Sequence, residues 1–166
     1  MAAPDGFHDF VADRYHALVR SAYLLVSNPS DAEDLVQDAL ARCVPAWHRI
    51  EGSPEAYVRR VMVRQNISRW RRTKGREITV ETVPDTAVRD RDVTQRDELR
   101  AALSQLPARQ RTAVVLRHVE DRSEAQTAEL MGCTVGTVKS QTHAGLARLR
   151  TILDDSARVE ATTSGT

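Results

Sequence analysis

The residues of this sequence that are best suited to chemistry are basic ones crowded into one short stretch. Positions 59 to 76 contain eight basic side chains and no acidic one, namely Arg59, Arg60, Arg64, Arg69, Arg71, Arg72, Lys74 and Arg76. Guanidinium groups bind phosphate oxygens in pairs and stack on flat rings, so this basic block suits a polyanion. A solvated helix face is the alternative interpretation of the same charges.

Three aromatic residues lie in or near the basic block. Trp47, Tyr57 and Trp70 are candidates for stacking on bases or for wedging a duplex apart, because aromatic rings beside cations are typical of strand-binding surfaces. Each ring is also a candidate for the core, and for Tyr57 the core is the favoured interpretation. For Asn66 the sequence allows two roles, as a residue that reads bases or as a polar group that packs between helices.

A row of acidic residues precedes the basic block. Asp31, Asp34 and Asp38 recur at i, i+3 and i+7, on one helix face, with Glu33 and Gln37 beside them. Acids in a first helical turn are favoured by the helix dipole, which accounts for Asp31 and Glu33 but not for Asp38. Like charges at this spacing weaken an isolated helix, so the row indicates an arginine-rich partner.

A third polar group follows Gly132, which is predicted to adopt positive φ at a turn. Ser123 to Met131 predicts a short helix with a capping box, and Thr134 is predicted to cap a longer one. The spacing of Ala128, Gly132 and Val138 is typical of a helix-turn-helix. The second helix then presents short polar or basic groups outward: Thr134, Thr137, Lys139, Ser140, Gln141 and His143. An ordinary helical hairpin is the alternative.

Apolar periodicity predicts the elements that position these groups. Residues 7–26, 30–44, 54–72, 94–105, 107–119, 123–131 and 134–153 have helical spacing, with a capping box at Ser30 and a helix end at Pro45. The predicted fold class is all-α, with two small helical domains joined by a flexible acidic linker. The predicted domains are 5–74 and 94–155, the linker is 75–93, and 156–166 is a disordered tail.

Composition excludes several other classes of protein. The two cysteines, Cys43 and Cys133, have no metal-ligand spacing, which predicts reduced thiols and a cytoplasmic protein. We find no secretory signal, no apolar stretch long enough to insert into a membrane, no Gly-rich phosphate loop and no nucleophile elbow. The sequence therefore predicts no catalytic site, no metal, no cofactor and no small-molecule substrate.

Residues 106–140 read LPARQRTAVVLRHVEDRSEAQTAELMGCTVGTVKS, which resembles region 4 of the extracytoplasmic-function sigma factors of bacterial RNA polymerase. The hallmarks are LPxRQR, an acidic residue before S-x-A-x-x-A, and GTVKS. Residues 30–40, SDAEDLVQDAL, are similar to region 2.2 of that family, and 57–60, 66 and 69–72 fall where it keeps regions 2.3 and 2.4. The pattern is most similar to the actinobacterial SigE-type subgroup. It departs at Thr127, and after Ser140 it lacks the usual arginine-rich run.

The resemblance implies three interfaces. One binds core polymerase, on the clamp coiled coil of β′, through Asp31, Glu33, Asp34, Leu35, Gln37 and Asp38. A second opens and reads the −10 element through Trp47, Arg59, Arg60, Arg64, Asn66, Arg69, Trp70, Arg71 and Arg72. A third reads the −35 element through Ser123, Thr134, Val135, Gly136, Thr137, Lys139, Ser140, Gln141, His143 and Arg148. The β flap and an anti-sigma factor are further implied partners.

Two other functions compete with this interpretation. A stand-alone helix-turn-helix regulator explains the C-terminal half, but it leaves the basic block and the acidic row without a role. A nuclease would need a metal site, and a row such as Asp31, Asp34 and Asp38 along one helix makes a poor octahedral cage. The sequence therefore favours a promoter-recognition factor.

Overall fold

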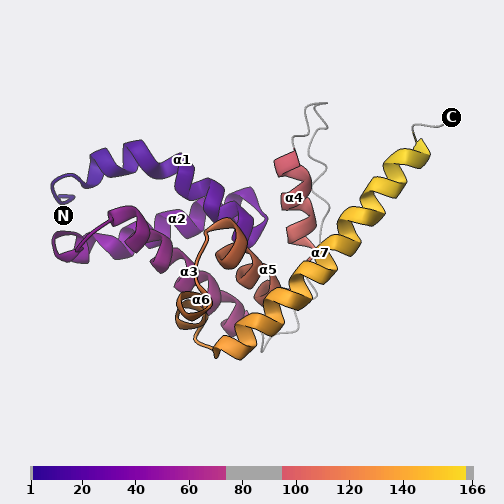
Figure 1. The fold of residues 1–166 in the computed structure, drawn as a ribbon. Coiled ribbons are helices and arrows are strands. Elements are labelled where there is room, and N and C mark those ends of the chain that lie inside the picture. Colours follow the sequence, from indigo (N-terminus) through magenta and orange to yellow (C-terminus); the bar gives the residue numbers. More distant parts are fainter. Residues whose placement is uncertain (1, 74–94, 164–166) are drawn as a thin grey trace.

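The computed structural model describes residues 2–73 and 95–163, and all regular elements in these ranges are helical (Figure 1). This confirms the predicted all-α fold class. In chain order the elements are α1 (Phe7–Val26), α2 (Pro29–Cys43), the 3-10 helix η1 (Val44–Arg49), α3 (Pro54–Thr73), α4 (Gln95–Ser104), α5 (Ala108–Val114), the π-helical turn η2 (Val115–Val119), α6 (Glu124–Met131) and α7 (Val135–Thr163). The predicted linker, 75–93, lies outside the described residues.

The first three α-helices form an N-terminal body, residues 2–73, around a core of their own. Leu18 of α1, Leu35 and Val36 of α2 and Met62 of α3 are almost completely buried there. The helix η1 closes one end of this core, because the Trp47 ring lies 5.0 Å from that of Phe7. The aliphatic periodicity of the three segments thus becomes a three-helix core, as predicted.

The start of α2 differs by two residues from the prediction. Asn28, and not Ser30, is the N-cap: its side chain accepts a hydrogen bond from the Asp31 amide at 3.1 Å. Pro29 then occupies the first helical turn, where its missing N–H costs no hydrogen bond and its fixed φ suits the helix. The predicted end of the helix before Pro45 is confirmed, since α2 ends at Cys43.

The C-terminal body, residues 95–163, contains the predicted helix-turn-helix. Ser123 and Gln126 form the predicted capping box at the start of α6, and Gly132 ends that helix with φ 64°. The Thr134 hydroxyl accepts a hydrogen bond from the Thr137 amide at 3.1 Å, which caps α7. Val138 is completely buried behind the turn. Local sequence signals therefore position this motif correctly.

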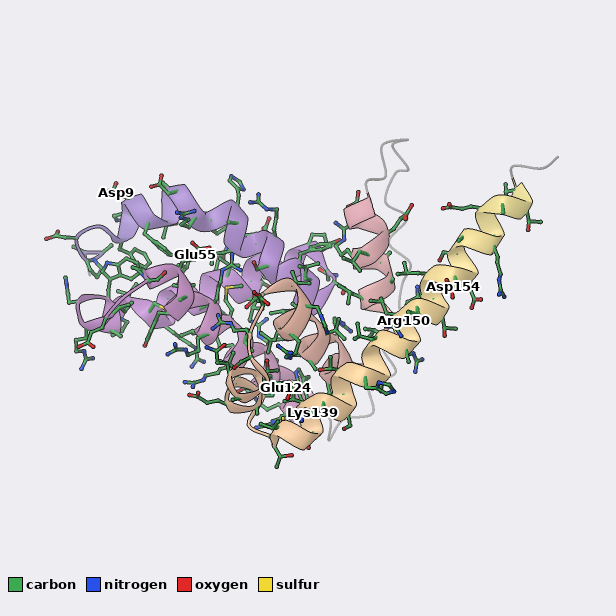
Figure 2. The ribbon with its side chains drawn as sticks, in the orientation of Figure 1. Asp9, Glu55, Glu124, Lys139, Arg150 and Asp154 are labelled. Carbon is green, nitrogen blue, oxygen red and sulfur yellow. The ribbon has the colours of Figure 1, made fainter. Side chains whose placement is uncertain are left out.

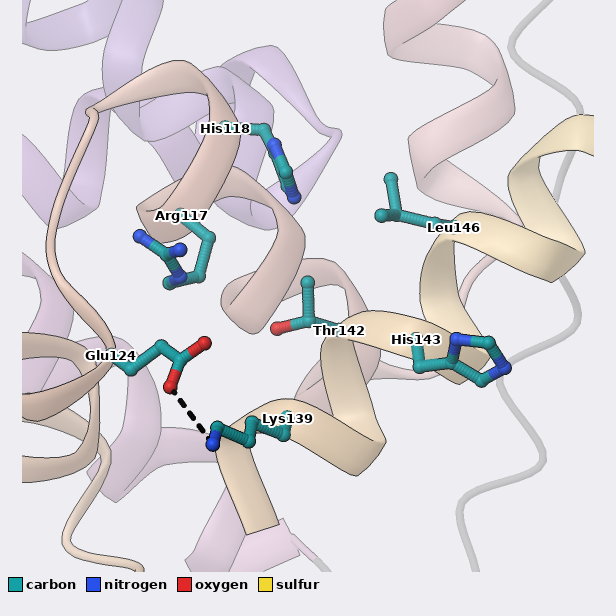
Figure 3. A pocket seen from close by; sticks show the side chains of 7 residues that line it. All are labelled: Arg117, His118, Glu124, Lys139, Thr142, His143 and Leu146. Atoms are coloured by element: carbon teal, nitrogen blue, oxygen red, sulfur yellow. Dashed lines mark ion pairs between the residues drawn. The ribbon is translucent and has the colours of Figure 1, made fainter. Parts of the chain in front are cut away.

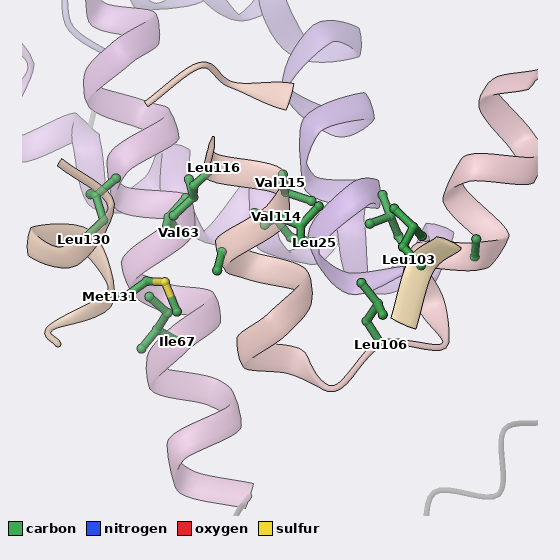
Figure 4. Close-up of a cluster of buried hydrophobic side chains, with 13 residues drawn as sticks. Leu25, Val63, Ile67, Leu103, Leu106, Val114, Val115, Leu116, Leu130 and Met131 are labelled. Atoms are coloured by element: carbon green, nitrogen blue, oxygen red, sulfur yellow. The ribbon is translucent and has the colours of Figure 1, made fainter. Parts of the chain in front are cut away.

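The two bodies share a second apolar core, which the sequence did not predict. Leu25, Val63 and Ile67 from the N-terminal body pack in one cluster with residues of the C-terminal body that include Leu116 and Met131 (Figure 4). Each of these five side chains is less than 5 % exposed. The described helices therefore form one packed unit rather than two separate ones.

The last helix is longer than predicted. The sequence predicts a helix end near Leu153 and a disordered tail from residue 156, whereas α7 continues to Thr163 and projects beyond the rest of the fold (Figure 1). No proline or glycine follows Gly145 before the helix ends, so nothing in the sequence breaks it. The hydroxyls of Ser156 and Thr162 donate back to carbonyls four residues earlier. No helix in the described ranges is long and apolar enough to cross a membrane.

Candidate nucleic-acid interface

The acidic row lies on the solvent-facing side of α2. Its polar members are all exposed: Asp31, Glu33, Asp34, Gln37 and Asp38. Asp38 forms an ion pair with Arg69 of α3, with Oδ2 and Nη2 2.5 Å apart. Leu35 was predicted to share this face, but its side chain is completely buried in the core of the N-terminal body. It therefore holds α2 in place and does not contact a partner.

The arginines of α3 divide between solvent and the C-terminal body. Arg60 and Arg72 are exposed. Arg59 contacts Glu55 and Ser21, and its Nη1 lies 3.6 Å from Glu120, just after η2. The Arg59 side chain of α3 thus contacts the C-terminal body.

Two further arginines of α3 contact helix α6. Arg64 lies 3.8 Å from Glu129, in an exposed ion pair. Arg71 donates a hydrogen bond of 3.0 Å to the carbonyl of Met131, at the turn of the helix-turn-helix. Three arginines of the basic block, Arg59, Arg64 and Arg71, therefore contact the C-terminal body in this conformation.

The aromatic residues and Asn66, for which the sequence left two roles open, all pack on or in the apolar cores. Trp47 packs against Phe7 and Phe10 and donates its Nε1 hydrogen to the Asp5 carbonyl, so it belongs to the core. Tyr57 packs on that core too, as favoured. Asn66 is only 7 % exposed, which indicates helix packing. The half-buried Trp70 ring lies on the shared core.

One side of the recognition helix α7 borders an open cationic pocket (Figure 3). The pocket has a volume of about 240 Å3 and is lined by Arg117, His118, Glu124, Lys139, Thr142, His143 and Leu146. Lys139 pairs with Glu124 at 3.6 Å, and both are partly exposed. Arg117 and His118 escaped the sequence prediction because they precede the motif by several residues and reach it only through the fold.

The remaining predicted residues of the helix-turn-helix have structural as well as surface roles. The Ser123 and Thr134 hydroxyls cap α6 and α7, and the Ser140 hydroxyl donates to the Thr137 carbonyl. Val135, Gly136 and Arg148 are exposed. Figure 2 shows Lys139 near the first turn of α7, with Arg150 and Asp154 further along the same helix.

The opposite side of the recognition helix faces the N-terminal body. Thr137 and Gln141 line a cavity of about 30 Å3 together with Trp70, Arg71 and Arg109. The Arg109 guanidinium lies 5.2 Å from the Trp70 ring centre. Residues predicted to bind the −10 element and residues predicted to bind the −35 element thus line the same cavity.

Burial shifts the pKa of a thiol and of a guanidinium group in this structure. Burial raises the pKa of the Cys43 thiol to about 11. Burial also lowers the pKa of the Arg111 guanidinium, which donates hydrogen bonds to the carbonyls of Leu25 and Leu106 at 3.0 Å each. Among the described residues, no group of three or more His, Cys, Asp or Glu is arranged to hold a metal ion.

Comparisons with known proteins place this arrangement in a family. Residues 10–76 match Sigma-70 region 2, and residues 96–149 match Sigma-70 region 4. The chain is 43% identical over 148 residues to an RNA polymerase sigma-E factor of Streptomyces coelicolor, covering 87% of this chain and 84% of that protein. It is 33% identical over 144 residues to the ECF RNA polymerase sigma factor SigM of Mycobacterium tuberculosis, covering 84% and 74%.

A solved structure has the same arrangement of helices. The sigma factor RpoE of Bartonella quintana, solved in complex with the anti-sigma factor NepR, has a TM-score of 0.68 and 26% identity, covering 91% of this chain and 98% of that one. Both halves of the present chain therefore match sigma factors in sequence, and the helices match over nearly the full length. The chain belongs to the extracytoplasmic-function sigma factors, and its function is promoter-specific initiation of transcription.

Proposed function

We propose that this sigma factor divides its work between the two bodies, with core polymerase and the −10 element bound by the N-terminal body and the −35 element by the C-terminal body. The observation that carries the proposal is the placement of the two charged faces. Exposed acidic side chains lie along α2, whereas the pocket beside the recognition helix is lined by Arg117 and Lys139 together with a single acid, Glu124. A protein partner and a DNA partner suit these opposite signs.

The acidic row is the proposed docking site for core polymerase. Its five polar side chains are exposed on a helix that is anchored from behind by Leu35 and Val36. Such a rigid acidic face fits an arginine-rich helical surface, for which the clamp coiled coil of β′ is the proposed partner. The β flap is the proposed partner of the C-terminal body.

The recognition helix is the proposed reader of the −35 element. The start of α7, with the exposed Val135 and Gly136, directs backbone N–H groups outward, where a phosphate binds favourably. Lys139 and His143 extend that surface along the next turns, and Arg117 joins it from η2. Phosphate contacts of this kind fix the position of the helix on the DNA, whereas contacts with base edges determine which sequence is recognised.

The −10 element is assigned to the exposed arginines of α3. Arg60 and Arg72 are accessible, and Arg64 and Arg71 lie on the same helix. We further propose that the protein acts in the cytoplasm, performs no catalysis itself and is controlled by an anti-sigma factor. The last proposal is supported by the likeness to a sigma factor that was solved with one.

Run-off transcription tests the proposed division of work. Purified core RNA polymerase is incubated with a pool of genomic promoters, with and without this protein. We expect new start sites that depend on the protein and share two upstream elements. Intact binding to a palindromic site without any new start would instead support a stand-alone regulator, and the basic block would then need another role.

A further inference from the structure

The first turns of the recognition helix carry little positive charge. Within residues 135–147 of α7, all of them described, Lys139 is the single lysine or arginine. Arg148 and Arg150 follow only further along the helix. The attraction of this surface to a DNA backbone therefore depends strongly on the charge of Lys139 and on the groups beside it.

The charge of Lys139 is opposed at short range by Glu124 of α6. Lys139 Nζ lies 3.6 Å from Glu124 Oε2, and the two side chains are 63% and 37% exposed. Figure 3 shows them pointing toward each other at the pocket beside α7. Glu124 is the single acid among the residues that line this pocket, whose permanent cations are Arg117 and Lys139. One of these two positive charges is thus offset before DNA binds.

The start of α6 fixes the backbone position of Glu124. Ser123 Oγ accepts a hydrogen bond from the Gln126 amide at 3.1 Å, and Gln126 Oε1 accepts one from the Ser123 amide at 3.0 Å. Glu124 is the first residue of the helix that follows, where the helix dipole favours an acid. The helix dipole is a second explanation for an acid at this position, so a test has to separate folding stability from DNA affinity.

A phosphate that binds Lys139 is repelled by the Glu124 carboxylate. The hydrogen bond from an ammonium group to a phosphate oxygen is ~2.8 Å long, so that oxygen would lie within ~7 Å of Glu124 Oε2. This distance is shorter than the Debye length of ~8 Å at physiological ionic strength. Salt therefore screens the repulsion only in part.

We propose that Glu124 sets the affinity of the −35 interface by weakening the sequence-independent attraction of α7 to the DNA backbone. Contacts with base edges, which carry the sequence information, are left to the outward side chains of α7. Weak attraction to the backbone limits capture of the protein by non-promoter DNA, which competes in large excess. The inference rests on the proposed function, because it uses the assignment of α7 to the −35 element.

Glu124→Gln tests the proposal, because it removes the negative charge and keeps the shape of the side chain. Native and variant chains are each assembled with core polymerase, and fluorescence anisotropy measures binding to a labelled duplex that carries the −35 element found by run-off transcription. At low salt we expect about fivefold tighter binding by the variant. The slope of log affinity against log salt should be steeper by about one unit. A duplex of scrambled sequence should gain affinity by a similar factor, since backbone contacts do not depend on sequence.

Glu160→Gln on the same helix is the matched control. It makes the same change in charge at an exposed position that lies ~30 Å further along α7 than Lys139, at ~1.5 Å per residue. This distance is several times the Debye length, so the affinity and the salt slope should equal those of the native chain.

Three outcomes separate the explanations. Equal affinity and salt slope for Glu124→Gln and the native chain would overturn the proposal, and a lower melting temperature of that variant would then assign the acid to the helix dipole alone. Glu124→Asp keeps the charge and should restore weak binding, whereas tight binding by Glu124→Asp would also reject a role for charge. Failure of the proposed function differs from both, because the native assembly would then bind the −35 duplex and the scrambled duplex equally well.

Discussion

At the scale of single residues, burial controls the chemistry of Cys43. This thiol is completely buried in the core of the N-terminal body, and burial raises its pKa from 9.0 to about 11. The buried neutral thiol packs as a small apolar side chain, since the low-dielectric surroundings penalise the thiolate. It therefore has a structural role and is shielded from reagents that need the thiolate.

Alkaline pH should destabilise the protein through Cys43. The thiol of the unfolded chain ionises above pH 9, whereas the thiol of the folded chain stays protonated. The contribution of the Cys43 thiol to stability is therefore complete below its unfolded pKa and is lost as pH rises through its folded pKa. At about pH 10.5 the expected loss in unfolding free energy is about 2 kcal/mol. Urea denaturation of the native chain and of Cys43→Ala, at a pH below 9 and at about pH 10.5, measures this loss in unfolding free energy. An equally steep loss in the variant would contradict the assignment.

Lys139 should contribute one phosphate contact to binding of the −35 element. Its side chain is 63% exposed, and its ammonium group lies 3.6 Å from the Glu124 carboxylate on the rim of the pocket. Lys139→Ala should reduce the slope of log affinity against log salt by about one unit. Fluorescence anisotropy on duplex DNA measures the slope. Lys139→Arg keeps the charge and should keep the slope, whereas an unchanged slope in Lys139→Ala would reject the contact.

At the scale of elements, the ends of helices show how local signals compete. Two capping signals overlap before α2, and Asn28 is the cap rather than Ser30 because Pro29 fits the first helical turn. Before α6 a single capping box is present, and the prediction was confirmed there. Local sequence therefore specifies a helix start clearly only where one candidate cap is available.

Asn28→Ala should lower the free energy of unfolding by about 1 kcal/mol, since the Asp31 amide loses its acceptor. Ser30→Ala is the matched control and should have a much smaller effect, because Ser30 lies inside the helix. Chemical denaturation compares the two variants with the native chain. A larger effect at Ser30 than at Asn28 would show that the helix begins later than described.

Close packing of α5 and α7 depends on Gly145. A Cβ atom at this position would lie 2.7 Å from Val114 Cγ2 and 3.2 Å from the Gln110 carbonyl oxygen. Gly145→Ala should therefore destabilise the fold by about 1–3 kcal/mol, despite the higher helix propensity of alanine. Gly136→Ala is the control, because a Cβ there meets only Thr134 Oγ1 at 3.8 Å. Thermal unfolding that ranks Gly136→Ala as the less stable variant would contradict this packing.

At the scale of the whole molecule, the acidic row and the recognition helix belong to different bodies and can be tested separately. The row lies on α2, which is anchored in the core of the N-terminal body, while the shared core involves other helices. Loss of polymerase docking is therefore expected to leave DNA contacts of α7 and the stability of the fold intact.

Asp34→Arg should abolish binding to core polymerase without unfolding the chain. The side chain is exposed in the middle of the acidic row, so a positive charge there repels a basic partner at little cost to folding. Asp13→Arg, an exposed charge reversal on α1, is the control and should still bind. Size-exclusion chromatography with core enzyme and circular dichroism give the two readouts. Assembly of Asp34→Arg with the polymerase would place the docking face elsewhere.

Local sequence signals were sufficient to predict most of the helices, the helix-turn-helix and the family. Apolar periodicity, the capping box at Ser123 and the glycine at 132 are local signals, and each depends on residues only a few positions apart. The exposure of the acidic row followed from its spacing in the same way. These features needed no knowledge of how distant segments meet.

The accessibility of the predicted contact residues depends on tertiary packing. Leu35, Trp47 and Asn66 share their sequence neighbourhoods with exposed residues, yet packing from α1 and α3 buries them wholly or in part. Arg117 and His118 join the recognition surface only because η2 folds against α7. The shared core likewise depends on contacts between residues far apart in sequence, such as Leu25 and Leu116, and such contacts leave no periodic signal.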